Sequence, residues 1–174
     1  MVAVFLTIII SFFITSLFGY VVHWSLHQKW AGILYKAHRV HHFQKYPISD
    51  FISDTYRQAG INSTPKFFFI GALPLIIVPI VLWHAGIMPL SIMITVLIVE
   101  AIMGFLHNYL HDAFHIRNHW LYRVPVINKW FSHWFKLHYL HHYNIKKNFG
   151  ICNFFWDRVF GSFWKIDKSV RVKS

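Results

Sequence analysis

Ten histidines are grouped along the chain in two pairs and two triplets. The pairs are His23-x3-His27 and His107-x3-His111, and the triplets are His38-x2-His41-His42 and His138-x2-His141-His142. Residues three and four apart lie on one face of a helix, so each cluster directs its imidazoles the same way. Because the four clusters together offer ten nitrogen ligands, the sequence predicts a site that holds two metal ions.

Packing alone is a poor account of so many histidines. A single histidine in an apolar helix is usually a packed, hydrogen-bonded side chain. Ten clustered imidazoles without a metal would desolvate many polar groups, at a cost of about 1–3 kcal/mol each. Imidazole suits Fe, Zn, Cu and Ni alike, but a structural zinc site closes at four ligands and typically uses cysteine. Cys152 is the single cysteine, and five nitrogens per ion would leave a position open for oxygen chemistry at non-haem iron.

The third cluster has two possible assignments. His111-x3-His115 repeats the spacing of His107-x3-His111, so His115 competes with His107 as a ligand. His107 is favoured because it lies where an apolar stretch ends. The neighbouring Asp112 is either an acceptor that orients an imidazole or a solvated or capping acid.

Composition places the chain in a membrane. It is 56% hydrophobic and 20% aromatic, outside the usual balance of a soluble domain. Its 174 residues suit a single unit covering 1–174. Three apolar stretches are long enough to cross a bilayer as helices, the first an anchor without the basic region or cleavage site of a signal peptide. The expected spans are 2–22, 67–83 and 87–106, with a fourth if Pro74 and Pro79 break the second.

The charges predict the orientation of these spans. Every Lys and Arg lies in Lys29 to Lys66 or in Arg117 to Lys173, so the positive-inside rule puts both segments on the cytoplasmic side. The N-terminus and His84 then face the opposite side, and all ten clustered histidines share the cytoplasmic face. The net charge of +11 is therefore a topology signal, and no nucleic acid partner is expected.

A few further residues carry expectations. Glu100 is the one acid within a span. Either it supports the metal site, as a partner of a ligand or as part of a polar path to the metals, or it is satisfied by helix packing. Aromatic and basic residues mix in 120–136 and 149–165, which is typical of a membrane interface and compatible with a lid over the site. Asp157 and Arg158 are expected to form a structural pair.

The four clusters, taken in order, resemble those of a known family. HWSLH (23–27), HRVHH (38–42), HNYLH (107–111) and HYLHH (138–142), followed by NFG (148–150) and WDRVFGS (156–162), are similar to the fatty acid hydroxylase/sterol desaturase superfamily of membrane di-iron enzymes. The resemblance implies activation of O2 at a di-iron centre and hydroxylation or desaturation of a lipid. Carried over by position, it implies the metal ligands His23, His27, His38, His41, His42, His107, His111, His138, His141 and His142.

The expected cofactors and partners follow from this reading. Two Fe ions, with Zn as a possible substitute, would use O2, and a separate electron-transfer protein would supply electrons because the chain has no dinucleotide fingerprint and no haem-binding domain. Membrane lipids surround the protein and a lipid is its substrate. Fatty acyl, sphingolipid, sterol and carotenoid substrates all fit, as do hydroxylation and desaturation.

The predicted fold is an all-α integral membrane protein with about three spans and a cytoplasmic helical cap that holds the dimetal site. The membrane would be the endoplasmic reticulum in a eukaryote or the inner membrane in a bacterium. Two other classes fit less well. A membrane haem protein needs fewer histidines than the triplets supply, and a metal transporter would place its ligands and several acids inside the membrane.

Overall fold

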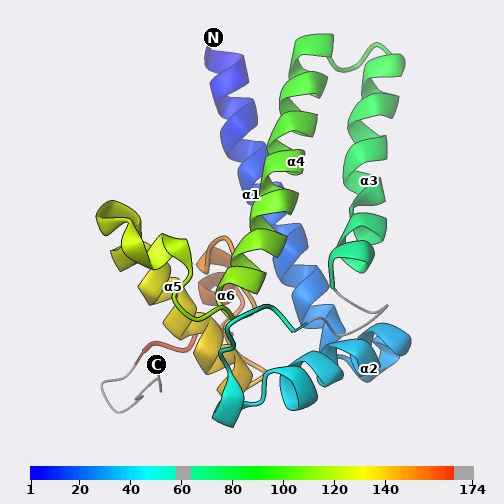
Figure 1. Cartoon of the computed structure of the whole chain (residues 1–174). Coiled ribbons are helices and arrows are strands. Elements are labelled where there is room, and N and C mark those ends of the chain that lie inside the picture. Colours follow the sequence, from blue (N-terminus) through cyan, green and yellow to red (C-terminus); the bar gives the residue numbers. More distant parts are fainter. Residues whose placement is uncertain (58–63, 167–174) are drawn as a thin grey trace.

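Three long helices and a helical cap make up the part of the chain that the computed structural model describes, residues 1–57 and 64–166, with side chains from residue 72 in the second range. The long helices are α1 (Val2–Leu26), α3 (Thr64–His84) and α4 (Leu90–Ala113), and the cap contains α2 (Ile33–Val40), α5 (Pro125–Tyr143) and α6 (Phe155–Val159) (Figure 1). Short turns of 3-10 or π helix complete the cap: η1 (Lys29–Ala31), η2 (His41–Lys45), η3 (Ile48–Asp50) and η5 (Trp120–Arg123). These residues form no β-strand beyond one isolated bridge, Ser53 to Ile116. The all-α prediction is confirmed.

Two of the long helices, α1 and α4, have the length and composition of membrane spans. Only 17% and 22% of their most apolar windows are buried within the protein, whereas the core helix of a soluble domain is mostly buried. Large apolar side chains such as Phe5, Ile98 and Phe105 are exposed on them, and a bilayer would cover this surface. Both helices run past the spans expected from sequence, α1 by one turn and α4 by nearly two, because the histidine clusters continue the same helices.

The proline-containing segment forms one helix, α3, rather than two. Pro74 and Pro79 both lie inside Thr64–His84, as helices in a membrane tolerate. Among the described side chains, Ala72–His84 is apolar but shorter than a span, and the residues of the predicted span before 72 lie outside the described side chains. The alternative of a fourth span from a broken helix therefore finds no support.

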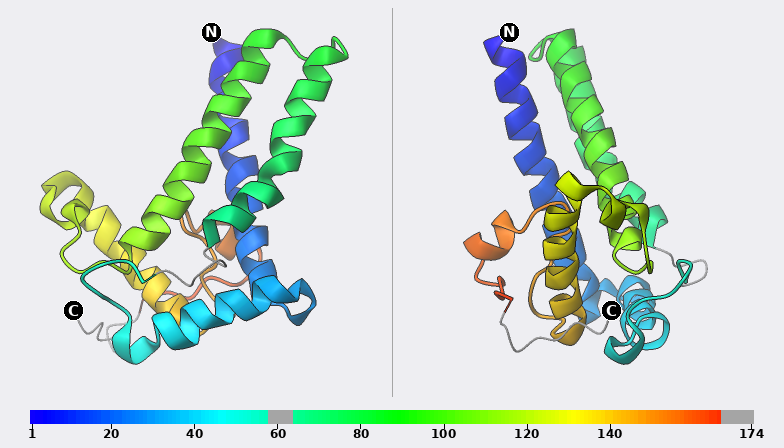
Figure 2. Two further views of the ribbon diagram at one scale, coloured as in Figure 1. Left: turned by 45° about the vertical axis from the view of Figure 1, so that its right-hand side comes forward. Right: turned by 60° about the vertical axis from the view of Figure 1, so that its left-hand side comes forward.

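All three long helices rise from the cap in the same general direction, and both additional views show this arrangement (Figures 1 and 2). The N-terminus and the turn after His84 lie at the end far from the cap. Helix α4 packs against both α1 and α3. As a result, the cap-side ends of α1 and α4 lie together, and these ends carry the two histidine pairs.

Aromatic side chains hold the cap together. The core cluster consists of Phe51, Leu110, Ala113, Phe114, Leu121, Phe131, Phe135, Tyr139 and Ile151. These residues come from the end of α4, from α5 and from the loops around them, so burying them fixes α5 against α4. Helix α5 begins at Pro125, a residue favoured at the first helical position because it needs no hydrogen-bonded N–H there.

Candidate metal centre

The cap and the ends of α1 and α4 bring nine histidines into two adjacent groups. In each group, every histidine contributes one ring nitrogen, and these nitrogens all lie within 4.8 Å of one another. The first group, five residues, is His23, His27, His38, His42 and His141. The second group, four residues, is His41, His115, His138 and His142. All are buried except His27, which is partly exposed.

Helix geometry explains how the triplets divide between the groups. Residues four apart share a helix face, whereas consecutive residues point about 100° apart. The outer pair of each triplet therefore joins one group and the middle histidine joins the other. His38 and His42 belong to the first group and His41 to the second, whereas His138 and His142 belong to the second group and His141 to the first. The first triplet runs into a π-helical turn, His41–Lys45, a feature often found at functional sites.

His111 lies beside the second group. Its ring centroid is 4.7 Å from that of His41 and 5.0 Å from that of His138. Its Nε2 atom is buried and has no hydrogen-bond partner among the described residues. With His111 included, the second group has five imidazoles, as many as the first.

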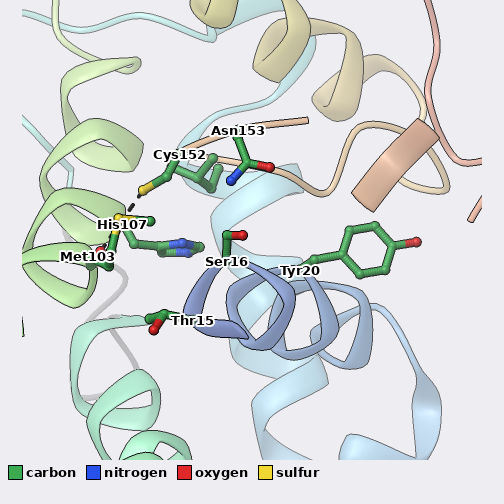
Figure 3. A pocket seen from close by; sticks show the side chains of 8 residues that line it. Thr15, Ser16, Tyr20, Met103, His107, Cys152 and Asn153 are labelled. Atoms are coloured by element: carbon green, nitrogen blue, oxygen red, sulfur yellow. Dashed lines mark hydrogen bonds between the residues drawn. The ribbon is translucent and has the colours of Figure 1, made fainter. Parts of the chain in front are cut away.

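His107 is outside both groups. It faces α1, where a Cβ atom added at Gly19 would lie only 3.0 Å from its Nδ1. Figure 3 shows its ring directed toward α1 in a small recess that also contains Ser16, Met103 and Cys152. The recess has room for about one water molecule. The structure therefore brings His115, and not His107, together with the other clustered histidines.

Backbone carbonyls orient several of these imidazoles. The Nδ1 atoms of His23 and His141 donate to the carbonyls of Phe149 and Lys147, both at 2.7 Å. In the second group, the Nδ1 atoms donate at 3.0 Å, from His142 to Tyr46 and from His115 to Phe51. A carbonyl can only accept, so each of these rings carries its proton on Nδ1 and points the lone pair of Nε2 inward. This arrangement of a carbonyl behind an imidazole is the usual support of a histidine metal ligand.

Asp157 holds the loop that provides two of those carbonyls. Its carboxylate accepts hydrogen bonds from the backbone N–H groups of Phe149 at 2.7 Å and Gly150 at 2.8 Å, and from the hydroxyl of Ser162 at 2.7 Å. Burial raises the pKa of Asp157 above its ordinary value, and these hydrogen bonds offset part of that rise. The expected pair with Arg158 is not the main role of the acid: Arg158 donates to the Phe154 carbonyl at 3.0 Å instead.

Burial keeps the clustered imidazoles outside α1 and α4 neutral. Desolvation lowers the pKa of His27 to about 3. Desolvation, followed by repulsion from neighbouring imidazoles, lowers the pKa well below the ordinary value for His38, His41, His42, His115, His138, His141 and His142. A neutral imidazole has a free lone pair at neutral pH, which is the state that binds a metal ion.

Hydrogen bonds between the rings cannot satisfy all the imidazole nitrogens of the first group. Four Nε2 atoms form a closed ring of contacts: His27 to His141 at 3.1 Å, His27 to His38 at 3.0 Å, His38 to His42 at 3.0 Å, and His42 to His141 at 3.3 Å. An imidazole nitrogen either donates or accepts, never both. Because Nε2 of His141 is an acceptor, protons can alternate around the ring on only two of the four Nε2 atoms. Two protons are then shared among four contacts. A cation bound between the rings would satisfy all of the lone pairs.

The spacing of these nitrogens also fits a metal ion. Metal–nitrogen bonds of about 2.1 Å at angles near 90–110° place neighbouring ligand atoms about 3.0–3.4 Å apart. The ring of contacts in the first group falls in this range, as does the 3.2 Å between Nε2 of His138 and Nε2 of His115 in the second. In the second group, both nitrogens of His41 and the Nε2 of His142 are buried without a hydrogen-bond partner among the described residues. The donor set therefore fits one ion in each group.

Other residues singled out by sequence lie around or away from this centre. Asp112, whose side chain is 35% exposed, places Oδ1 3.4 Å from Nδ1 of His111, a contact through which it can orient that imidazole. Glu100 has a buried Oε2 with no hydrogen-bond partner among the described residues, so this oxygen makes no hydrogen bond to the histidines. His84 ends α3 at the far end of the long helices.

Sequence reasoning missed the residues behind the ligands. The carbonyls of Tyr46, Phe51, Lys147 and Phe149 carry no signal in their side chains. Asp157 did carry one, because it belongs to the WDRVFGS segment at 156–162. The signal for His115 was its four-residue spacing from His111.

One family model matches the chain, and it covers nearly all of the elements described above. The fatty acid hydroxylase model matches residues 8–162, from the first turns of α1 to the residues just after α6. No curated protein and no solved structure matches the chain. The matched region contains all four histidine clusters and the Asp157 segment, and the chain belongs to the fatty acid hydroxylase family.

Proposed function

We propose that this chain is an iron-dependent membrane oxidoreductase that uses O2 to hydroxylate, or desaturate, a lipid. The observation that supports it most is the pair of buried imidazole groups, each with converging nitrogens at the spacing of metal ligands. When bound, a pair of iron ions supplies the activation of O2 that oxidation of an unactivated C–H bond requires. Membership of the fatty acid hydroxylase family supports a lipid substrate.

The proposed ligand set differs from the sequence expectation at one position. One ion would be held by His23, His27, His38, His42 and His141, and the other by His41, His111, His115, His138 and His142. His115 replaces His107 in this set because it shares a 3.2 Å contact with His138 and donates to a carbonyl through Nδ1. His107 instead lines the recess beside α1.

The protein residues perform three tasks at this site. Neutral, buried imidazoles provide the lone pairs, and the carbonyls of Phe149, Lys147, Tyr46 and Phe51 fix their orientation. Burial of all members but His27 excludes bulk water from the centre, which protects a reactive oxidant from side reactions.

Electrons and protons enter from outside the chain. Hydroxylation consumes the C–H substrate, O2, two electrons and two protons, and yields the alcohol and water. Cys152, the single cysteine, cannot form an iron–sulfur cluster alone. We therefore include a separate electron-transfer protein in the proposal.

The proposed topology has three spans and a cytoplasmic centre. The described parts of the two lysine- and arginine-rich segments make up the cap at one end of the long helices, which favours a cytoplasmic location for the histidines. The membrane would be that of the endoplasmic reticulum in a eukaryote or the inner membrane in a bacterium.

Haem binding and metal transport have less support. Haem takes at most two axial ligands, whereas each group brings four or five imidazole nitrogens within 4.8 Å of one another. A transport path would need ligands along the spans, but the grouped histidines belong to the cap and to the cap-side end of α1.

The test combines metal content with lipid analysis. Full-length protein purified in a mild detergent should contain two metal ions per chain by elemental analysis, iron in active preparations or zinc as a substitute. Cells that express it should accumulate a lipid one oxygen heavier or two hydrogens lighter than its precursor, and cells that express the His141→Ala variant should not. Folded protein with one metal ion or none would reject the two-ion centre.

A further inference from the structure

A groove beside the end of α1 leads to the first histidine group. Its walls come from the last turns of α1 and from the segment that follows α5, which runs beside α1 (Figure 2). This α1 groove has a volume of about 410 Å³, within the range of small-molecule sites. It is lined by Tyr20, Trp24, His27, Gln28, Ile145, Lys146, Lys147, Phe149, Phe160, Gly161 and Ser162.

His27 connects the groove to the histidines. It is the one member of the first group that is not fully buried, and it lines the groove. Its Nε2 lies 3.0 Å from Nε2 of His38 and 3.1 Å from Nε2 of His141. A molecule in the groove would therefore reach the first group directly.

A second, more apolar groove does not reach the histidines. It lies between α4, η5 and α5, and Leu110, Trp130 and Trp134 are among its lining residues. No histidine lines it.

The α1 groove combines an aromatic wall with a cationic rim. Tyr20 and Phe160 stack with their ring centroids 5.2 Å apart, and Trp24 is exposed beside them. On the rim, Lys146 is exposed, and the Nζ of Lys147 donates to the Gly161 carbonyl at 3.1 Å. The lining residues include no Asp or Glu, so the cationic charge has no acidic partner within the groove.

We propose that the α1 groove admits a lipid with an anionic headgroup, a carboxylate or a phosphate. Lys146 binds the headgroup, and the acyl chain lies over Tyr20 and Phe160 toward His27. An amphipathic ligand matches a groove that is aromatic on one side and cationic on the other. This inference rests on the proposed function and adds the class of substrate and its route.

Photolabelling of the full-length protein tests the inference without turnover. The probe is palmitic acid with a diazirine in its chain, added to protein in a neutral detergent, and labelled peptides are identified by mass spectrometry. Labels should fall within residues 20–28, 145–149 and 160–162, which line the α1 groove and not the other one. Labels confined to the groove between α4 and α5 would overturn the proposal.

Charge variants give the second measurement. Lys146→Glu should reduce labelling by about fivefold or more, since one lysine contributes about a factor of five to binding an anionic lipid, whereas Lys146→Arg should retain it. The matched control is Lys129→Glu, the same change at an exposed lysine of α5 that lines neither groove. Equal labelling of Lys146→Glu and the unaltered protein, with equal metal content, would overturn the proposal.

Two further arms separate the possible ligands and the two proposals. Inorganic phosphate at the probe concentration should leave labelling in place, because the acyl chain supplies much of the affinity. If phosphate displaced the probe, the groove would be a site for the anion alone, and the proposal of a lipid ligand would be overturned. Labelling of the groove without any oxidised product in cells would reject the oxidoreductase and retain the groove. Oxidised product without labelling there would reject the groove alone.

Discussion

His23 and Phe149, 126 residues apart, are joined by a 2.7 Å hydrogen bond from Nδ1 of the histidine to the carbonyl of the phenylalanine. The bond ties the cap end of α1 to the loop after α5. The same loop contains Lys147, whose carbonyl orients His141. The loop thus positions two members of the first histidine group, and residues that fix it should affect metal binding from a distance.

Asp157→Asn should weaken metal binding although Asp157 touches no metal ligand. The amide would retain one acceptor but place an NH2 group against a backbone N–H of Phe149 or Gly150. Leaving one buried donor unsatisfied costs about 1–3 kcal/mol. We expect a lower midpoint of thermal unfolding and less metal per chain. Asp54→Asn, at an acid whose side chain is 89% exposed, is the matched control and should change neither.

Gly150→Ala should damage the same loop by a steric route. A Cβ at this position would lie 2.8 Å from Oδ2 of Asp157 and would clash with the backbone carbonyl of Asn153. Because backbone cannot move aside as a flexible side chain does, the loop must shift. We expect reduced metal content and a lower unfolding midpoint than the unaltered protein. Gly86→Ala tests whether any glycine loss has this effect; no atom lies within 4 Å of its added Cβ, so only the strain of its positive φ remains. An equal loss of metal in both variants would contradict the argument.

His115→Ala and His107→Ala should differ sharply. His115 lies in the second group and contacts Nε2 of His138 at 3.2 Å, so its loss removes a proposed ligand, and metal content should fall from two ions toward one. His107 faces Gly19, so its replacement should leave both ions in place. Elemental analysis of the two purified variants makes the comparison. If His107→Ala lost an ion and His115→Ala did not, the ligand set inferred from sequence would be restored.

Much of this site follows from spacing alone. The four-residue repeats place His38 with His42 and His138 with His142, because they share a helix face. Which of two overlapping repeats turns inward at the end of α4 depends on where the helix meets its neighbours. His107 is one turn too early, at the level of Gly19 on α1, whereas His115 lies just after the helix ends at Ala113. Local sequence does not contain that register between helices.

The fold was predictable to a similar extent. Apolar length was enough to locate α1, α3 and α4, because a bilayer sets the length of a span. The cap-side ends of α1 and α4 lie beyond the ends expected from sequence, because the histidine pairs continue both helices past their apolar part. The loop at 147–150 was not predictable as support for the ligands, since it acts through backbone carbonyls that any residue type would provide.

Acid should destabilise the protein after its metal is removed with a chelator. Burial lowers the pKa of His27 to about 3, and lowers that of His38 and His142 as well, whereas in the unfolded chain these groups titrate near their ordinary value of about 6.5. Below this value the unfolded chain binds protons that the folded chain does not, so the free energy of unfolding falls as the pH falls. The midpoint of denaturant unfolding should be level above about pH 7 and should decline from there toward pH 5. A midpoint that rises over this interval would contradict the burial of neutral imidazoles.

The orientation in the membrane gives the last prediction. If Lys29 to Lys66 and Arg117 to Lys173 both remain in the cytoplasm, then the chain crosses the bilayer three times, and its termini lie on opposite sides. A reporter fused before Met1 should be accessible from outside the cytoplasm, and one fused after Ser174 only from within it. A third reporter, inserted after Gly86 in the turn between α3 and α4, should behave like the N-terminal one. That turn lies at the same end of the helix bundle as the N-terminus of the chain. Cytoplasmic signals from both termini would mean an even number of spans, and would place one of the apolar helices on the membrane surface or within the cap instead of across the bilayer.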